Sequence, residues 1–320
     1  MVTGSNDLDY QNLADQFQGS YLWLNAQYPK SDGSTGVVRG SAVRLNEDWV
    51  LTAAHNLYAA SAPTNNSITV GNGSNFTTSP GTTISCSTDI IMLPGFNDAA
   101  ISNGTDLALV RLLSPLSGPT LALGSAGVGE LVYEVGFGKH GTPATGLLAA
   151  DGNVRAFEAY VSSAPVLGAP DYFYNTTNFG FDGGETLALN GRGAPGDSGS
   201  GVFNSRGELV GIATGYNGAP TDPFGTTYYM DLTNPEVSSW ILSTIATSSS
   251  SPMHLTASVQ NNHVTVVVEN GSPGATVTLQ SSTDLQAWAD SGTVTLSLSG
   301  TGTHTETING PQRFFRVKLP

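Results

Sequence analysis

Three short segments carry residue types that could together activate a hydroxyl group. His55 ends the apolar segment 49–54, Asp106 begins the apolar run Leu107–Val110, and Ser198 lies in a glycine-rich loop. A hydroxyl is a poor nucleophile unless a base removes its proton, and a third group must hold that base in the right tautomer. The three residues therefore suit nucleophilic catalysis, if the fold brings them together.

Each residue alone has a structural alternative, because short motifs match by chance. His55 could be a core histidine bonded to backbone, Asp106 a turn residue at the entry to a strand, and Ser198 part of an ordinary turn. A carboxylate beside an apolar strand is costly to bury unless it accepts hydrogen bonds, and an imidazole N–H is a natural donor. The first 250 residues contain only two histidines, His55 and His140. The combination favours a catalytic site over three unrelated structural roles.

The elements that must position these residues are predicted to be β-strands. Only 11% of the residues are charged and 39 of the 320 are glycine, which suits an all-β protein with tight turns. Residues 1–18 are polar and predict a strapping segment or a short helix from Asp9 to Phe17. Asn234, Pro235 and Glu236 suit the start of a second helix. Strands are predicted at 20–25, 37–45, 49–52, 107–112, 131–137, 153–161, 186–189 and 208–214.

The charge balance and the cysteine count exclude several classes of protein. The chain has 11 Lys and Arg against 25 Asp and Glu, a net charge of −14, so a nucleic-acid partner is excluded. No apolar run approaches the ~18 residues of a membrane span. Cys86 is the single cysteine, so no disulfide forms within the chain, and it is expected to be an inert apolar filler. Three lysines and an acidic, Asn/Thr-rich composition favour secretion, with Met1 standing where an export signal was removed.

A polar segment at 247–252 predicts a linker, followed by a small β-sandwich at 253–320. Trp288 is the candidate there for binding a polysaccharide, a surface or a protein. The alternative is that Trp288, Phe314 and Phe315 are core residues. His263 and His304 lack carboxylate partners in the sequence, so no metal site is expected. Six strands are predicted in this module, at 255–259, 264–269, 276–281, 293–297, 303–308 and 314–319.

The three motifs together resemble the trypsin/chymotrypsin family of serine endopeptidases. The matching segments are Thr-Ala-Ala-His ending at His55, Asp-Leu-Ala-Leu beginning at Asp106 and Gly-Asp-Ser-Gly around Ser198, in the family's order. Asn56 stands where many members have a cysteine, which points to a bacterial, disulfide-free branch. The resemblance covers about 19–246 and implies two six-stranded antiparallel β-barrels, from about 19 to 113 and from about 119 to 232, closed by a C-terminal helix.

The resemblance also implies the role of each residue. Ser198 would attack the scissile carbonyl, His55 would accept and return the proton, and Asp106 would orient His55. The backbone N–H groups of Gly196 and Ser198 would form the oxyanion hole. Asp197 needs a partner, either a basic group or a processed N-terminus, because no usual activation sequence is present. No cofactor is implied.

Substrate recognition is implied at two further places. The segment Thr214–Gly215–Tyr216 would pair with the substrate as an added strand. Arg192 stands where the floor of the primary pocket is expected and would favour an acidic P1 side chain, unless it points to solvent or pairs with Glu185. Tyr216 would instead narrow the pocket and favour small side chains. The rival class is a catalytically silent binding or adhesion protein on the same fold.

Overall fold

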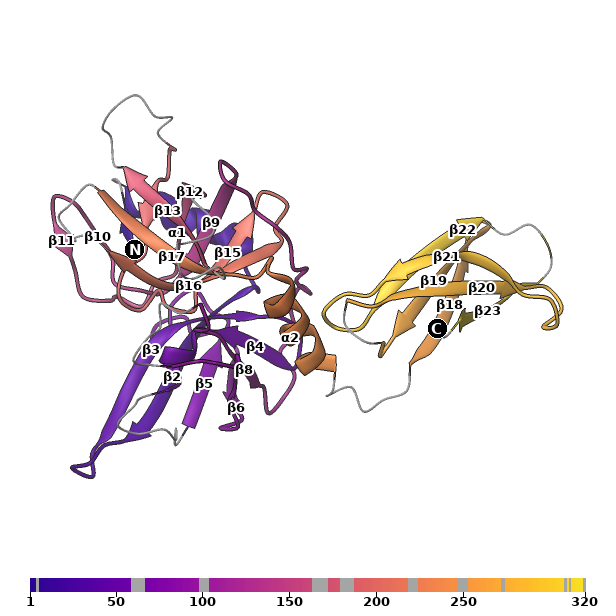
Figure 1. Cartoon of the computed structure of the whole chain (residues 1–320), viewed down its shortest axis with the longest axis horizontal. Coiled ribbons are helices and arrows are strands. Elements are labelled where there is room, and N and C mark those ends of the chain that lie inside the picture. The colour runs from indigo at the N-terminus through magenta and orange to yellow at the C-terminus, as the bar shows by residue number, and fades with distance from the viewer. Residues whose placement is uncertain are drawn as a thin grey trace. The chain divides into compact units, whose positions relative to one another are not determined.

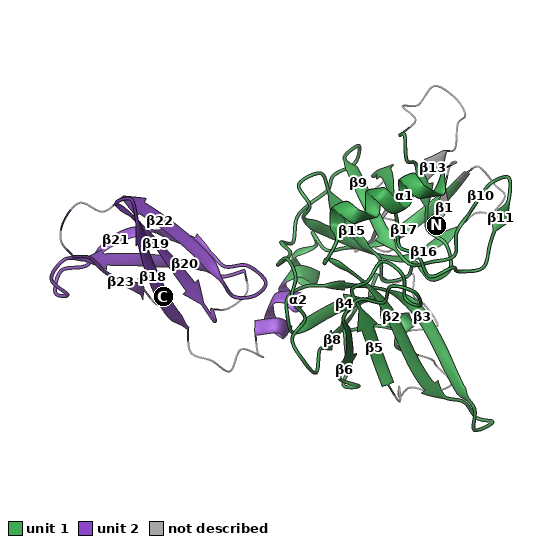
Figure 2. Ribbon diagram, turned by 180° about the vertical axis from the view of Figure 1, so that it is seen from behind, with its two compact units in different colours: residues 1–238 green, residues 239–320 purple. Residues whose placement is uncertain are grey.

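The computed structural model describes the chain except for residues 4–5, 59–66, 98–103, 163–171, 179–186, 218–223, 247–252, 272–273, 308–309, 311 and 319–320. The chain divides into two compact units, residues 1–238 and 239–320 (Figures 1 and 2). Among the described residues, no helix is long and apolar enough to cross a membrane.

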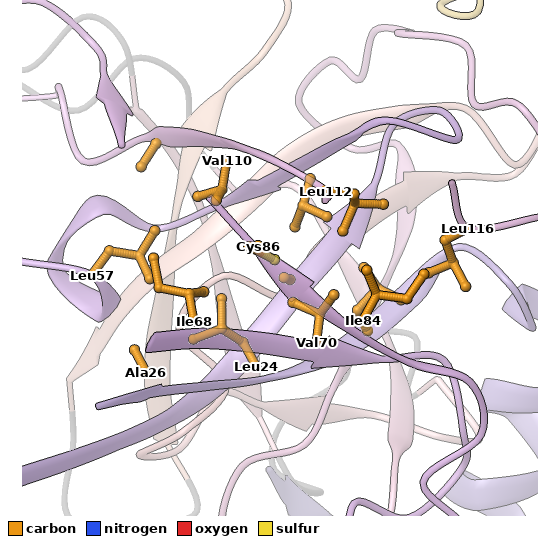
Figure 3. Close-up of a cluster of buried hydrophobic side chains, with 14 of the residues drawn as sticks. Leu24, Ala26, Leu57, Ile68, Val70, Ile84, Cys86, Val110, Leu112 and Leu116 are labelled. Carbon is orange, nitrogen blue, oxygen red and sulfur yellow. The ribbon is translucent and has the colours of Figure 1, made fainter. Parts of the chain in front are cut away.

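The first half of unit 1 is a curled seven-stranded antiparallel sheet in the order β6-β5-β2-β3-β4-β8-β7. Alternate side chains of these strands face one interior, where Leu24, Ile68, Val70 and Val110 form a buried cluster (Figure 3). The short helix η2 (Ala54–Asn56) follows β4 directly. The strands are β2 (Tyr21–Pro29), β3 (Thr35–Arg44), β4 (Trp49–Thr52), β5 (Ser67–Gly71), β6 (Thr83–Cys86), β7 (Ile91–Met92) and β8 (Ala108–Arg111).

The second half of unit 1 is a six-stranded sheet in the order β12-β9-β15-β16-β17-β13. Its buried cluster includes Val132, Phe157, Val202 and Tyr229. The loop that contains Ser198 (residues 193–200, the nucleophile loop) connects the short strand β14 (Gly191–Arg192) to β15. The sheet therefore fixes one end of this loop. The strands are β9 (Leu131–Gly136), β12 (Arg155–Tyr160), β13 (Tyr172–Asn178), β15 (Gly201–Asn204), β16 (Leu209–Asn217) and β17 (Phe224–Asp231).

The N-terminal segment packs on this second sheet, although the first sheet follows it in sequence. Met1 and Tyr10 belong to the buried cluster of the second sheet, and the Tyr10 hydroxyl donates to the Asn190 carbonyl at 2.9 Å. The segment comprises β1 (Val2–Thr3), α1 (Asp7–Ala14) and the 3-10 turn η1 (Asp15–Phe17). Strand β1 lies between β10 (Gly141–Thr142) and β14 (Gly191–Arg192), and β10 also pairs with β11 (Gly146–Leu147).

Helix α2 (Pro235–Ala246) begins where its capping residues predict. The Asn234 side chain accepts the backbone N–H of Glu236 at 2.8 Å. Val237, Ile241 and Ile245 are buried on one face, as their i, i+4, i+8 spacing requires. The division between the two units falls inside this helix, and the predicted linker at 247–252 lies outside the described residues.

The second unit contains two three-stranded sheets, in the orders β18-β19-β22 and β21-β20-β23. Val264 and Val266 of the first and Leu279 and Val294 of the second share one buried cluster, and Phe315 packs against it. Trp288 is half-buried, with the Arg316 guanidinium 4.2 Å from the centre of its ring. The strands are β18 (His254–Gln260), β19 (His263–Glu269), β20 (Thr276–Ser282), β21 (Ala289–Thr295), β22 (Gly302–Thr307) and β23 (Phe314–Lys318).

The predicted all-β class with two curled half-barrels and few helices is confirmed. The first sheet has seven strands rather than six, because the two-residue strand β7 adds an edge to β8. The strand predicted at 186–189 is wrong in its described part, since residues 187–189 form no strand. The backbone turns at residues 188–189, and its described backbone pairing with β12 is limited to the Leu189 carbonyl, which accepts the Glu158 N–H at 2.9 Å, and a one-residue bridge at Asn190.

Candidate active site

His55 and Asp106 are brought together by two neighbouring strands of the first sheet. His55 lies in η2 after β4, and Asp106 lies two residues before β8, which pairs with β4. The His55 Nδ1 is 2.7 Å from Asp106 Oδ2, and the His55 backbone N–H donates to Asp106 Oδ1 at 2.9 Å. Asp106 is fully buried and therefore needs these donors. The carboxylate holds the proton on Nδ1, which leaves Nε2 of the imidazole as a proton acceptor.

The Thr214 hydroxyl is a third donor to the Asp106 carboxylate. The pairing of β16 with β17 is irregular between Ala213 and Gly215, so Thr214 is an extra residue there. Such a bulge redirects the side chain of the extra residue. The hydroxyl of Thr214, a residue predicted to bind substrate, is therefore already bonded to Asp106, and only its backbone is left for the predicted pairing with a substrate.

Ser198 lies in a tight turn whose glycines adopt conformations closed to other residues. Gly196 and Gly199 have φ of +95° and +87°. A Cβ on Gly199 would lie 2.0 Å from the Ser41 carbonyl oxygen, so only glycine fits there. The Ser198 carbonyl accepts the Asn56 side-chain N–H at 2.7 Å and the Ser41 N–H at 3.0 Å. The loop from the second half is therefore fixed by β3 and η2 of the first half, next to His55.

The half-buried Ser198 side chain remains free in the described part of the structure, where no hydrogen bond joins it to His55. Catalytic hydrogen bonds of this kind are often long without substrate and tighten in the complex. Within the same described residues, the backbone N–H groups of Gly196 and Ser198 also donate to no acceptor. Two open donors beside an open hydroxyl suit an oxyanion-binding site.

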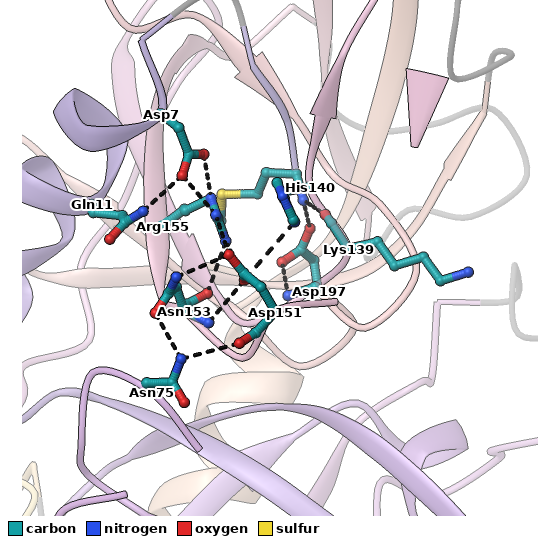
Figure 4. Close-up of polar contacts among 11 residues, drawn as sticks. Asp7, Gln11, Asn75, Lys139, His140, Asp151, Asn153, Arg155 and Asp197 are labelled. Carbon is teal, nitrogen blue, oxygen red and sulfur yellow. Dashed lines mark hydrogen bonds and ion pairs between the residues drawn. The ribbon is translucent and has the colours of Figure 1, made fainter. Parts of the chain in front are cut away.

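Asp197 is paired with the amino group of Met1. The Met1 nitrogen is 2.8 Å from Asp197 Oδ2 and also donates to the Lys139 carbonyl, and both members of the ion pair are almost fully buried (Figure 4). Asp197 further accepts the N–H groups of Gly138 and Ala194 at 2.8 and 3.0 Å. The Asp197 carboxylate, which directly precedes Ser198, therefore braces the loop through one ion pair and two backbone hydrogen bonds.

A small pocket beside Ser198 has a free volume of about 10 Å³, roughly the space of one water molecule. Its lining includes the predicted residues Gly215 and Tyr216 and also the buried carboxyl of Glu134. The Tyr229 hydroxyl donates to Glu134 Oε2 at 3.0 Å, whereas Oε1 is buried without a hydrogen-bond partner. Burial, and next the nearby Asp197 carboxylate, raise the pKa of Glu134 well above its usual range.

Arg192 is not among the residues that line this pocket. Its side chain is 1% exposed, and its Nη1 donates to the Asn217 carbonyl at 3.1 Å, close to Gly225. The guanidinium is therefore buried against β17 and does not point to solvent. Glu185, the alternative partner predicted for Arg192, lies outside the described residues.

Three contributors to the site were missed by reasoning from sequence. These are the Thr214 hydroxyl on Asp106, the Met1 amine on Asp197 and Glu134 in the small pocket. Only Glu134 carries a signal in the sequence, a lone carboxylate in an otherwise apolar strand. In the described ranges, no cluster of His, Cys, Asp and Glu could hold a metal ion.

The fold and these contacts define a class: an all-β peptidase whose candidate site is assembled from two sheets. The chain matches the model of the Trypsin-like peptidase domain over residues 35–212, more than half of its length, and it belongs to that family. Among solved structures it is similar to mouse neuropsin, a serine protease expressed in the limbic system of the brain. The match has 18% identity and a TM-score of 0.52, and it covers 71% of this chain and 95% of the other. No curated protein sequence matches the chain.

Proposed function

We propose that the protein is a serine endopeptidase with Ser198 as nucleophile, His55 as general base and Asp106 as its orienting group. The observation that carries this proposal is the 2.7 Å contact between Asp106 Oδ2 and His55 Nδ1, which leaves Nε2 open near the Ser198 loop. A binding scaffold gains nothing from a buried carboxylate with three donors on it, because burying that charge is costly.

In the proposed reaction, Ser198 Oγ attacks the scissile carbonyl carbon while His55 Nε2 takes the hydroxyl proton. The carbonyl oxygen becomes an oxyanion and accepts the N–H groups of Gly196 and Ser198; losing one such donor costs about 10²–10³ in rate. His55 then gives its proton to the leaving amine, and a water molecule hydrolyses the acyl-enzyme by the same route. Asp106 stabilises the imidazolium in both steps.

The proposed primary specificity is for small P1 residues such as Gly, Ala and Ser. The pocket beside Ser198 has room for about one water molecule, and Tyr216 stands at its wall. An acidic P1 side chain is disfavoured, because the small pocket has no room for a carboxylate and Arg192 is not among the residues that line it. A library of peptides that differ only at P1 tests this preference, and equally fast cleavage after Glu would contradict it.

The decisive test is covalent labelling of Ser198 with a fluorophosphonate, followed by peptide mapping. We expect an adduct on Ser198, and we expect Ser198→Ala to lose both labelling and peptide hydrolysis while thermal unfolding changes little. Ser200→Ala is the matched control, because the Ser200 hydroxyl is fully buried and has no hydrogen-bond partner. Correctly folded protein without an adduct on Ser198 would instead favour the catalytically silent binding protein.

The proposed place of action is outside a bacterial cell, with the second unit binding a surface, a polysaccharide or a protein. Three lysines and a net charge of −14 support export, and the half-buried Trp288 is the contact residue in that unit. Finding the protein in the culture medium of its source would agree with this proposal, and finding it only inside cells would contradict it.

A further inference from the structure

A second, larger pocket adjoins the nucleophile loop, since a Cβ on Gly196 would lie 3.8 Å from the carbonyl oxygens of the pocket's lining residues Arg39 and Phe137. Its volume is about 170 Å³, and it shares no lining residue with the small pocket beside Ser198. Ser41, which follows the lining residue Gly40, donates its hydroxyl to the Gly196 carbonyl at 3.1 Å and accepts the Phe137 N–H at 2.9 Å. The pocket is therefore in contact with the predicted oxyanion loop. It is lined by Trp23, Leu24, Asn25, Arg39, Gly40, Phe76 and Phe137.

This position fits the leaving-group half of a peptide substrate, an inference that depends on the proposed endopeptidase function. The acyl half is expected along Gly215 and Tyr216 of β16, with its P1 side chain in the small pocket. The larger pocket is formed by β2, β3, Phe76 and Phe137 and shares no residue with that side of the site, so the residues after the scissile bond are expected in it. We propose that this pocket binds the side chain of the first or second residue after the scissile bond, and that Arg39 selects glutamate there.

Arg39 supplies a positive charge that nothing in the described structure neutralises. Its side chain is exposed, its guanidinium lies 4.9 Å from the centre of the Phe76 ring, and no carboxylate of a described residue pairs with it. In a chain of net charge −14, an unpaired guanidinium at a pocket is an evident binding point for a carboxylate. A glutamate side chain would reach it with its methylene groups against the rings of Phe76 and Phe137.

Asn25 adds an acceptor at the same pocket. Its side-chain Oδ1 is buried and has no hydrogen-bond partner in the structure. A buried acceptor without a donor is unfavourable, so a rotation of the Asn25 side chain that turns Oδ1 towards an N–H group of a bound peptide would be favourable. The pocket therefore combines one cation with a polar wall, which suits a peptide better than an apolar small molecule.

The Phe76 wall is held in place by the second half of unit 1. The buried Asn75 donates its side-chain N–H groups to Asn153 Oδ1 at 2.7 Å and to the Asp151 carbonyl at 3.1 Å (Figure 4). The Phe76 N–H donates to the Gly152 carbonyl at 3.2 Å, and Asp151 is itself paired with buried Arg155 at 2.8 Å. The ring below the guanidinium is thus fixed before substrate arrives, which lowers the entropic cost of binding.

The first test measures hydrolysis of quenched fluorescent peptides with Ala at P1 and Glu, Gln or Leu at each of the two following positions. The full-length protein should show kcat/KM about three- to tenfold higher for Glu than for Gln at one of these positions, since an exposed charge pair is modest in strength. Arg39→Met should abolish the difference between Glu and Gln peptides. Arg111→Met, at an exposed arginine of β8, is the matched control and should preserve it.

The second test measures binding without catalysis. Labelled peptides that represent the leaving group, with Glu or Gln at the preferred position, are titrated by fluorescence anisotropy against the wild type, Arg39→Met and Ser198→Ala. Tighter binding of the Glu peptide that disappears in Arg39→Met supports the pocket even if no peptide is cleaved, in which case only the proposed function fails. Cleavage without any Arg39-dependent preference for Glu overturns this inference and leaves the proposed function standing.

Discussion

Replacing Thr214 by valine tests whether the Asp106 carboxylate depends on the donors that the structure gives it. Valine keeps the shape of threonine but removes the hydroxyl that donates to Asp106 Oδ2. Asp106 is fully buried, so no water replaces the lost donor at the present geometry. His55 then provides both remaining hydrogen bonds to the carboxylate, one from its backbone N–H and one from its ring.

The expected loss of stability in Thr214→Val follows from the strength of a hydrogen bond to a buried charge, about 1.5–3 kcal/mol. The free energy of unfolding should fall by that amount, and at about 2–4 °C per kcal/mol for a domain of this size the melting temperature should drop by about 3–12 °C. Turnover should fall about tenfold or more, because a poorly held carboxylate stabilises the His55 imidazolium less well. Calorimetry and peptide hydrolysis measure the two effects, and Thr214→Ser should restore most of both.

A double-mutant cycle separates this interaction from a general packing defect. In the Asp106→Asn background the hydroxyl meets a neutral group, so Thr214→Val should cost only about 0.5–1.5 kcal/mol. An equal loss of stability in both backgrounds, or wild-type turnover in Thr214→Val, would refute the argument that the hydroxyl acts through the charge of Asp106.

Three further predictions concern parts of the protein outside the reacting groups. Arg155 lowers the pKa of its two carboxylate partners below their usual value of 3.8, so their stabilisation is complete above that value and is lost as the pH falls through the lowered pKa. Arg155→Met should therefore lower the free energy of unfolding by about 1–3 kcal/mol at pH 7, a range that allows for the partly exposed carboxylates. The free energy of unfolding, measured with urea, should then fall less steeply as the pH is lowered below about 4 than it does in the wild type. An unchanged pH dependence would contradict this prediction. Burial raises the pKa of the Cys86 thiol to about 12, so a disulfide reagent should react only after denaturant is added. Gly199→Ala should prevent normal folding of the nucleophile loop, because its Cβ would meet the Ser41 carbonyl oxygen. Gly207 has a φ of +76° but open space around it, so Gly207→Ala should lower the free energy of unfolding by only about 1–2 kcal/mol, as measured by thermal unfolding. Similar effects of the two substitutions would count against the close contact with Ser41.

Much of the fold follows from local patterns in the sequence. The strand predicted at 49–52 matches β4, and the cap at Asn234 matches the start of α2, because an apolar run of strand length and a capping residue act within a few positions. The same holds for β9, predicted at 131–137 and found at Leu131–Gly136. The seventh strand of the first sheet could not be predicted, because two residues carry no periodicity and pair only through the tertiary context of β8.

The residues that complete the candidate site depend on contacts that are distant in sequence. Asp197 meets the chain terminus, and Thr214 reaches Asp106 only because a bulge redirects it. Arg192 was assigned to the primary pocket by its distance from Ser198, and only the structure shows that its guanidinium is buried against β17 and donates to the Asn217 carbonyl. A local motif indicates which groups are available, whereas the sheet register decides which way they point.

The position of the N-terminal segment has a consequence for how the two halves of unit 1 stay together. Met1 and Tyr10 are buried in the core of the second sheet, whereas residues 21–111 form the first sheet, so one continuous piece of chain contributes to both halves. A protease cut in the connecting stretch 113–130 would leave two fragments that stay associated through the packing of the N-terminal segment. The nicked protein would elute as one species from a sizing column and separate into two bands only in detergent.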